Sequence, residues 1–428
     1  MMNAVRATKL WRSALTAAIA IAVAATASLG PRLLAQTPAA ADGSARTDAP
    51  NRSKVATGID VLAADGCRQL QGRKVGLITN HTGRTADGRR TVDVLAAAEN
   101  VQLTALFSPE HGWQGVVDEK VGDTVDAATG LKVFSLYGKT RTPTDAMLAN
   151  VDTLVFDIQD IGCRFYTYIA TMRNALEAAA QHGLRFVVLD RPNPIGGLAV
   201  AGPVLAADNR DFVAAHTVPL RHGMTIGELA RMIVGENGLA VDLDIVRCRG
   251  WQRADLWHDT GLPWIDPSPN MRRLSQALTY PGIGLVEGTN VSVGRGTDTP
   301  FEILGAPWID ARALAAELTE QQLPGIAFVP VHFTPTASKH RGERCGGVHI
   351  LLTDWRTFEP VRTGIHVACA LHKLFAASWQ TDRLNWLLKD QSSCDAILNG
   401  DPADKILARW QQGLRLFGMR RRPFLLYE

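Results

Sequence analysis

Four apolar runs in the first half of the chain each end in residues whose side chains can transfer protons or bind polar ligands. Short runs rich in Val, Ile, Leu and Phe are typical of buried parallel strands, and ligands bind at the carboxyl ends of such strands. Turn formation alone would explain one such cluster, but four in succession favour a functional site at one edge of a sheet. The runs cover residues 75–78, 103–107, 154–156 and 186–189, and the polar residues that follow them include Asn80, Glu110, His111, Gln159, Asp160, Asp190, Arg191 and Asn193.

Glu110 and His111 lie in the sequence Ser-Pro-Glu-His-Gly, directly after the second run. A carboxylate beside an imidazole at a strand end suits general acid or base catalysis. The alternative is structural, with the Glu110 carboxylate binding a helix N-terminus or a loop amide. Glu110 is therefore the first catalytic candidate, with His111 and Asp160 as further ones.

The segment after the third run combines acids, an amide, an arginine and two tyrosines. Gln159, Arg164, Tyr166 and Tyr168 suit a polyhydroxylated ligand, because sugar hydroxyls need donors and acceptors while rings stack on apolar faces. Arg164 has an equally good structural alternative, an ion pair with a neighbouring aspartate.

Further candidates lie beyond the fourth run. Asn193 stands between two prolines in a rigid loop, and His222 precedes a predicted helix, although a lone histidine is more often structural. Glycines around Glu287, Asn290 and Arg295 allow close approach of the backbone to a ligand, and Arg295 could pair with a carboxylate. A glycine-rich surface turn is the alternative.

Helix-like stretches separate the apolar runs, which predicts an α/β fold with a mostly parallel sheet. The alanine-rich residues 171–182 predict a helix that ends at Gly183, so the third and fourth strands should be parallel. Residues 224–236 predict another helix, with Thr225 and Glu228 at capping-box spacing. Residues 250–296 read as a long irregular stretch, residues 326–333 and 348–353 as strands, and residues 311–318, 364–378 and 404–417 as helical.

The first 35 residues have the features of a secretory signal peptide, a basic start followed by a short alanine-rich apolar run and small residues. Residues 36–54 are rich in Ala, Thr, Asp, Ser and Pro and predict a disordered linker. We place a domain boundary near Tyr280, which gives domains over residues 55–279 and 280–428. The mature protein would be exported, to a periplasm or the cell exterior, without stable membrane insertion; an uncleaved anchor is the alternative.

Composition and missing motifs exclude several classes of function. The net charge of +3 is small, and no basic face interleaved with aromatics indicates a nucleic-acid partner. The sequence lacks HExxH, calcium-loop and CxxC spacings, and no GxGxxG or Walker A motif follows a strand, so we expect neither metal nor cofactor. The pairing of the six cysteines and the oligomeric state stay open.

From about Gly58 to its C-terminus the chain resembles the exo-β-N-acetylmuramidase family of bacterial cell-wall recycling. The order and spacing of nine motifs carry the resemblance: GLITNHTG, FSPEHGW, SLYGKTRTPT, FDIQDIGCRFYTYI, LDRPNPIGG, RHGMTIGELA, GLPWIDPSPNM, YPGIGLVEGTN and GRGTDTPFE. The resemblance implies a Rossmann-like N-terminal domain and a smaller α/β C-terminal domain with the active-site cleft between them. It also implies release of non-reducing terminal N-acetylmuramic acid (MurNAc) from peptidoglycan-derived saccharides such as MurNAc-GlcNAc.

The same resemblance assigns roles to residues. Glu110 would be the general acid or base, with Asp160, Asp190 or Glu287 as the second catalytic group. Arg164 or Arg295 would hold the lactyl carboxylate, which distinguishes muramic acid from glucosamine. The sugar site would be lined by Asn80, His111, Gln159, Tyr166, Tyr168, Asn193 and Asn290.

Three alternatives stay open on sequence alone. An exported protein could bind muropeptides without cutting them. An esterase or amidase would need a nucleophile, for which Cys163 and Ser108 are the only plausible residues. An endo-acting enzyme would cleave within glycan chains instead of at their ends.

Overall fold

The computed structural model describes residues 54–115 and 122–428, and residues Arg52–Glu428 belong to one unit. The predicted signal peptide and nearly all of the predicted linker lie outside the described residues. Within the described ranges, no helix combines the length and apolar character needed to cross a membrane.

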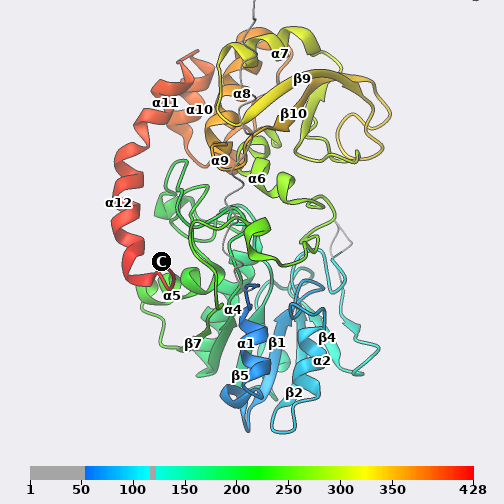
Figure 1. Cartoon of the computed structure of the whole chain (residues 1–428), viewed down its shortest axis with the longest axis vertical. Helices are drawn as coiled ribbons and strands as arrows, with labels where there is room; N and C mark the ends of the chain where they lie inside the picture. The colour runs from blue at the N-terminus through cyan, green and yellow to red at the C-terminus, as the bar shows by residue number, and fades with distance from the viewer. Residues whose placement is uncertain (1–53, 116–121) are drawn as a thin grey trace, which may run out of the picture. The chain divides into compact units, whose positions relative to one another are not determined.

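A seven-stranded sheet in the order β3-β4-β2-β1-β5-β6-β7 dominates the first half of the described chain (Figure 1). Neighbouring strands are parallel except at the edge, where β3 pairs antiparallel with β4. The four predicted strands are confirmed as β1, β2, β5 and β6, and β5 is parallel to β6 as expected. The strands are β1 (Lys74–Thr79), β2 (Gln102–Ser108), β3 (Thr124–Val125), β4 (Lys132–Ser135), β5 (Thr153–Asp157), β6 (Arg185–Leu189) and β7 (Asp242–Val246).

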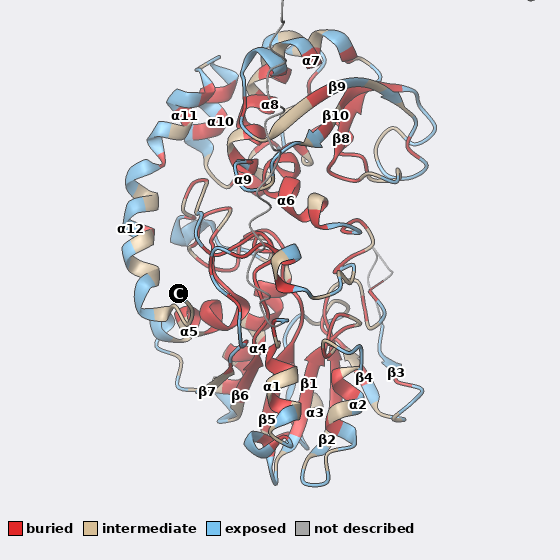
Figure 2. Cartoon of the chain, in the orientation of Figure 1, coloured by how far each residue is buried: buried red, intermediate tan, exposed pale blue. Residues whose placement is uncertain are grey.

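Side chains of the central strands alternate between two hydrophobic cores, one on each face of the sheet. In β5, Leu154 and Phe156 pack into the core that includes α4 and α5, whereas Val155 packs with residues of α1 and α2. Figure 2 shows these strands as buried. Because both faces are covered, the strands appear in the sequence as continuous apolar runs without polar alternation.

The helices around this sheet have the caps that the sequence indicates. Helix α4 ends at Gly183, whose φ of 63° is left-handed and costs glycine little. Helix α5 begins after Thr225, and Thr225 and Glu228 form the predicted capping box. The helices of this region are α1 (Gly58–Ala64), α2 (Thr91–Ala96), α3 (Asp145–Leu148), α4 (Tyr168–His182) and α5 (Ile226–Asn237).

A smaller antiparallel sheet with strand order β8-β10-β9 forms in the second half of the chain, and α7 packs against it and against α8. The predicted α/β class is thereby confirmed for both regions, while the domain limits near residue 280 stay a prediction. The elements here are β8 (Ile303–Ala306), β9 (Ile326–Phe333), β10 (Cys345–Leu352), α6 (Leu274–Ile283), α7 (Ala311–Glu320), α8 (Pro360–Phe375), α9 (Asn385–Leu388), α10 (Gln391–Leu398), α11 (Ala403–Arg409) and α12 (Gln411–Arg421).

One expectation about secondary structure is wrong in part. The stretch 250–296 is not irregular throughout, because it contains helix α6, whose last turn includes Pro281 and Gly282 and so hides the helical pattern. The helical character expected over residues 404–417 is confirmed, in two helices, α11 and α12, which meet at Trp410.

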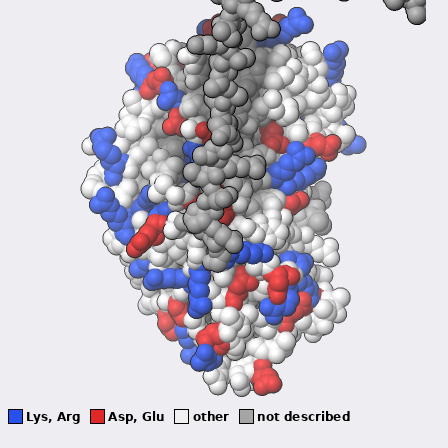
Figure 3. Space-filling view, in the orientation of Figure 1, with Lys and Arg blue, Asp and Glu red and all other residues white. Residues whose placement is uncertain are grey.

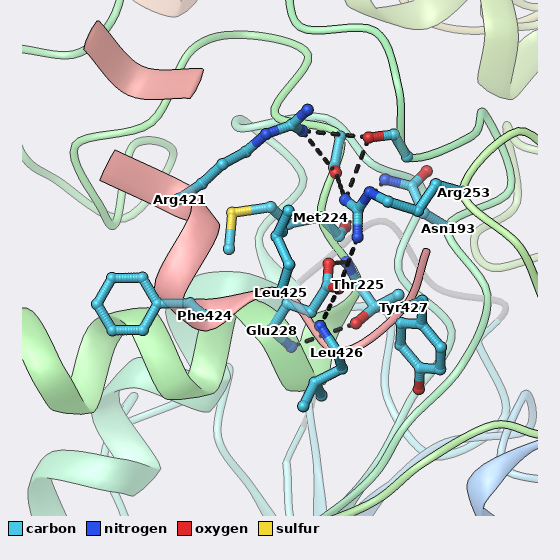
Figure 4. A network of polar contacts seen from close by, with 12 residues as sticks. Asn193, Met224, Thr225, Glu228, Arg253, Arg421, Phe424, Leu425, Leu426 and Tyr427 are labelled. Carbon is cyan, nitrogen blue, oxygen red and sulfur yellow. Dashed lines mark hydrogen bonds and ion pairs between the residues drawn. The ribbon is translucent and has the colours of Figure 1, made fainter. Parts of the chain in front are cut away.

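The C-terminal segment returns to the first sheet region along α12, and the chain ends near α5 (Figure 1). There Arg231 of α5 donates hydrogen bonds to the carbonyls of Phe424 and Leu425, at 3.0 and 3.3 Å. The Leu426 amide donates to the Glu228 carboxylate at 2.8 Å (Figure 4). These contacts tie the end of the chain to α5.

On the face shown in Figure 3, Lys and Arg side chains lie among Asp and Glu side chains instead of forming one block. This mixed pattern agrees with the small net charge of the chain.

Candidate active site

A cavity of about 450 Å³ is lined by segments that follow β2, β4, β5 and β6 and by residues from Ser268 to Leu387. Its volume is within the range of about 300–1,000 Å³ that is usual for small-ligand sites. The lining is aromatic and charged: Glu110, His111, Tyr137, Arg141, Phe165, Tyr166, Thr167, Tyr168, Asp211, Phe212, Val213, Ser268, Met271, Tyr280, Glu287, Arg295, Phe301, Trp386 and Leu387.

Glu110 is half-buried in the wall of this cavity, and the Thr167 hydroxyl donates a hydrogen bond to its carboxylate. Thr167 immediately precedes α4, so the carboxylate lies beside the N-terminal end of that helix. His111 follows with a left-handed φ of 69° and also lines the cavity. The hydrogen bond from Thr167 orients the Glu110 carboxylate and leaves it facing the cavity, as general acid or base catalysis requires.

Two tyrosines form a rigid part of the wall. The rings of Tyr166 and Tyr168 meet edge to face with centroids 4.9 Å apart. The Tyr168 hydroxyl donates to the Pro267 carbonyl at 2.6 Å and accepts from Asn80 at 3.0 Å. Burial raises the pKa of Tyr168 well above its usual value, so the hydroxyl keeps its proton. Asn80, which does not line the cavity, therefore positions a tyrosine that does.

Glu287 and Arg295 line the cavity as an ion pair. The Arg295 guanidinium also lies over the Phe301 ring, 5.2 Å from its centroid, and Lys339 donates to the Glu287 backbone carbonyl. Of the three residues expected to supply a second catalytic carboxylate, only Glu287 lines the cavity.

The loop after β4 contributes Tyr137 and Arg141, neither of which the sequence analysis nominated. The Arg141 guanidinium lies 3.9 Å from the Phe212 ring centroid and 5.6 Å from that of Tyr137. Recognising residues 132–135 as a strand would have placed both residues at a carboxyl end, where the other candidates were found.

The structure contradicts the expected role of Arg164 in binding a substrate carboxylate. Its side chain is 2% exposed, and its guanidinium donates to the backbone carbonyls of Pro203, Val218, Leu387 and Leu388 at 2.8–3.3 Å. Arg164 therefore ties the segment after β5 to α9. This agrees with the structural alternative for Arg164, except that its partners are backbone carbonyls and not a neighbouring aspartate.

Asp190, Arg191 and Asn193 likewise do not line the cavity, which corrects their expected roles in it. Asp190 accepts from the Gly227 amide and from the hydroxyls of Thr225 and Tyr427, and burial raises its pKa to about 6. The other two residues also have partners within the protein. Arg191 pairs with the Asp157 carboxylate at 2.6 and 3.0 Å, and Asn193 donates to the Met224 carbonyl and accepts from the Ile195 amide.

Gln159 and Asn290 are also occupied by main-chain partners outside the cavity. Gln159 donates to the carbonyls of Asp160 and Pro192, and Asn290 donates to the Ser378 carbonyl and accepts from the Gln380 amide. Both side chains bind loop backbone, and neither lines the described cavity.

Asp160 and His222 form a buried pair away from the cavity, which argues against their expected catalytic and binding roles. Asp160 accepts from the Gly162 amide at 2.8 Å, and His222 Nε2 lies 4.0 Å from Asp160 Oδ2. Burial raises the pKa of Asp160 to about 7 and lowers that of His222 to about 3. The histidine is therefore neutral at neutral pH, and the carboxyl group has no cation beside it.

This arrangement predicts that Asp160→Asn stabilises the protein at alkaline pH and leaves it active. A carboxyl whose pKa rises from about 4 unfolded to about 7 folded binds its proton more tightly in the folded state, so stability falls as pH rises from about 4 to about 7. Asparagine removes this loss, worth about 2–4 kcal/mol. Thermal unfolding of both proteins at about pH 5 and pH 8 measures this change in stability, and Asp208→Asn, at an exposed position, is the control. Loss of activity in Asp160→Asn would instead support a catalytic role for Asp160.

The two candidate nucleophiles of an esterase or amidase are both buried. Ser108 is 1% exposed and Cys163 is 0% exposed, and neither lines the cavity. Burial raises the pKa of Cys163 well above the usual thiol value, which disfavours the thiolate. All six cysteines lie in the described ranges as free thiols.

Within the described residues, no group of three or more His, Cys, Asp or Glu side chains is arranged to hold a metal ion.

Two family models together match most of the chain. The N-terminal model of exo-β-N-acetylmuramidase NamZ matches residues 75–275, and the C-terminal model matches residues 278–427. A Bacillus subtilis (strain 168) protein, peptidoglycan β-N-acetylmuramidase NamZ, is 43% identical over 396 residues, which is 91% of this chain and 96% of that protein.

Two crystal structures of DUF1343 family proteins from Bacteroides fragilis NCTC 9343 have the same fold. The first is 36% identical with a TM-score of 0.83 and covers 88% of this chain and 100% of its own. The second is 31% identical with a TM-score of 0.71, and the match covers 88% of this chain and 99% of the second protein.

Proposed function

Because this chain belongs to the exo-β-N-acetylmuramidase NamZ family, we propose that it hydrolyses the bond that links a non-reducing terminal MurNAc to the next sugar of a peptidoglycan fragment. The observation that carries the proposal is the Glu110 carboxylate in the wall of an aromatic cavity of about 450 Å³. Such a cavity has the stacking surfaces and polar groups that a saccharide needs.

The reaction requires proton transfer at the glycosidic bond. When the bond between the anomeric carbon and the glycosidic oxygen breaks, its electron pair stays on that oxygen, which takes a proton from a general acid. Water adds to the anomeric carbon and loses one proton to a carboxylate, which gives free MurNAc and a shortened saccharide. We assign one of these proton transfers to Glu110, whose orientation Thr167 fixes.

Glu287 is the second carboxylate we propose for this reaction. It lines the same cavity, and Arg295 holds its side chain by an ion pair. Asp211 also lines the cavity, but both oxygens of its carboxylate already accept hydrogen bonds. Lys389 donates to one at 2.6 Å and the Val213 amide donates to the other at 3.0 Å.

Incubation of the protein with the disaccharide MurNAc-GlcNAc and with intact peptidoglycan tests this function. Mass spectrometry should detect free MurNAc from the disaccharide, while the intact polymer should not be solubilised, since exo-action starts from chain ends. Solubilised polymer would indicate an endo-acting enzyme. Binding of the disaccharide without release of MurNAc would indicate a binding protein instead.

We also propose that the chain is exported, on the support of its N-terminal sequence alone. The basic start and short apolar run over the first 35 residues are those of a secretory signal peptide. Fusion of residues 1–54 to a reporter enzyme that is active only outside the cytoplasm tests this, and a reporter that stays inactive would contradict export.

A further inference from the structure

The cavity contains one arginine whose charge no acidic side chain of the described residues neutralises. Arg295 is paired with Glu287, and the two other carboxylates of the cavity, those of Glu110 and Asp211, contact Thr167 and Lys389. Among the ion pairs formed within the described ranges, none includes Arg141, although it lines the same cavity.

The exposed Arg141 guanidinium nevertheless packs against aromatic rings. Its guanidinium lies 3.9 Å from the Phe212 ring centroid, and the Phe212 and Tyr137 rings stack with centroids 5.9 Å apart and planes 30° apart. The Arg141 carbonyl accepts from Asn174 of α4 at 3.0 Å, which also fixes the backbone of this loop. Stacking satisfies the flat face of a guanidinium but leaves the N–H groups at its edge available to an acceptor.

We propose that Arg141 binds the lactyl carboxylate of MurNAc and thereby distinguishes this sugar from N-acetylglucosamine (GlcNAc). The inference rests on the proposed function and names the group of the substrate that one wall of the cavity recognises. A planar fork of N–H donors matches the two oxygens of a carboxylate, and orientation in advance lowers the entropy lost on binding. Arg164 is buried against carbonyls and Arg295 already has a carboxylate partner, so neither of the arginines expected from sequence offers the same donors.

The test compares para-nitrophenyl β-glycosides of MurNAc, of GlcNAc and of the MurNAc methyl ester, whose lactyl group carries no charge. Arg141→Gln should lower kcat/KM for the MurNAc glycoside by about 10- to 100-fold, the usual effect of losing hydrogen bonds to a charged group. The GlcNAc and methyl-ester glycosides should change less than about twofold, because they lack the charge that Arg141 recognises. Arg141→Lys should retain part of the discrimination, since it keeps the charge but loses the fork.

Arg383→Gln is the matched control. Arg383 also lies over an aromatic residue of the cavity wall, 4.7 Å from the Trp386 ring centroid, but does not itself line the cavity. Arg383→Gln should therefore leave the ratio of activity on the MurNAc glycoside to activity on the GlcNAc glycoside unchanged. A ratio that changes in Arg295→Gln but not in Arg141→Gln would overturn the inference, as would equal losses on all three glycosides in Arg141→Gln.

Calorimetric titration with free MurNAc separates this inference from the proposed function, because binding needs no hydrolysis. If the wild-type protein releases no sugar yet binds MurNAc more tightly than GlcNAc, and Arg141→Gln abolishes that preference, then the proposed reaction fails and the inference stands. If the wild-type protein cleaves its substrate and Arg141→Gln leaves the preference intact, the reaction stands and the inference fails.

Discussion

Glu110→Gln is expected to lower kcat for release of MurNAc from MurNAc-GlcNAc by about 10²- to 10⁴-fold, the usual contribution of a general acid or base. Glutamine keeps the size of the side chain and an oxygen that accepts from Thr167, so binding and folding should change little. Steady-state kinetics with the disaccharide measure kcat, and calorimetric titration with MurNAc measures whether the cavity still binds its sugar.

The leaving group shows which proton transfer Glu110 performs. Para-nitrophenolate leaves with little protonic assistance, whereas the hydroxyl of a sugar needs a proton as the bond breaks. If Glu110 is the general acid, the variant should lose much less activity on the para-nitrophenyl glycoside than on the disaccharide. If Glu110 is the base that activates water, both substrates should lose activity to a similar extent.

Glu177→Gln is a suitable control, because Glu177 lies on α4, pairs with Arg173 at 2.9 Å and does not line the cavity. Its activity should equal that of the wild-type protein. Undiminished release of MurNAc by Glu110→Gln would move the catalytic carboxylate elsewhere, and Glu287 would be examined next.

The central sheet could be predicted from the sequence because burial on both faces leaves a simple signal. Residues such as Leu154, Val155 and Phe156 are all apolar since each neighbour in the run enters one core or the other. Strand β4 (Lys132–Ser135), which lies between β2 and the edge strand β3, could not be predicted in this way, because it has only four residues and its burial alternates. Missing this strand also hid Arg141 and Tyr137, which follow its carboxyl end.

The candidate site could be predicted only as a region. Strand order brings Glu110, Gln159 and Asp190 to one edge of the sheet, but the sequence does not specify which way each side chain points. Glu110 lines the cavity, whereas Asp190 accepts hydrogen bonds from Thr225, Gly227 and Tyr427 behind it. Tyr427 lies near the far end of the chain, so no local pattern around Asp190 could have indicated that its carboxylate is already occupied.

The same limit applies to Arg164. A short motif that places an arginine beside aspartates and tyrosines suits sugar binding and loop stabilisation equally well. The decisive partners, the carbonyls of Leu387 and Leu388, are more than 200 positions away along the chain. Polar residues at strand ends therefore predict where a site lies, and the three-dimensional contacts decide which of them are free to act in it.

Arg253→Leu is expected to destabilise the protein by about 3–5 kcal/mol, the usual result of removing one partner of a buried ion pair. Arg253 binds Glu228 at 2.6 Å, and these side chains are 6% and 0% exposed (Figure 4). The arginine also donates to the carbonyls of Gly197 and Gly223, which would lose that donor. Denaturant unfolding measures the change, and Arg356→Leu is the control: that arginine is 56% exposed and pairs with Asp259 at 2.8 Å, so its loss should cost less than about 1 kcal/mol.

The buried charge left on Glu228 is the main reason for the large effect, and this can be tested separately. Adding Glu228→Gln to Arg253→Leu removes that charge and keeps one oxygen for the Leu426 amide, which donates to Glu228 at 2.8 Å. The other oxygen, which accepts from the Thr225 amide, is lost, and this neutral hydrogen bond is worth less than the buried charge costs. The double variant should therefore be more stable than Arg253→Leu alone. If it is less stable, the loss comes from the hydrogen bonds that hold the C-terminal segment to α5, and proteolysis of residues 422–428 should then be faster in both variants.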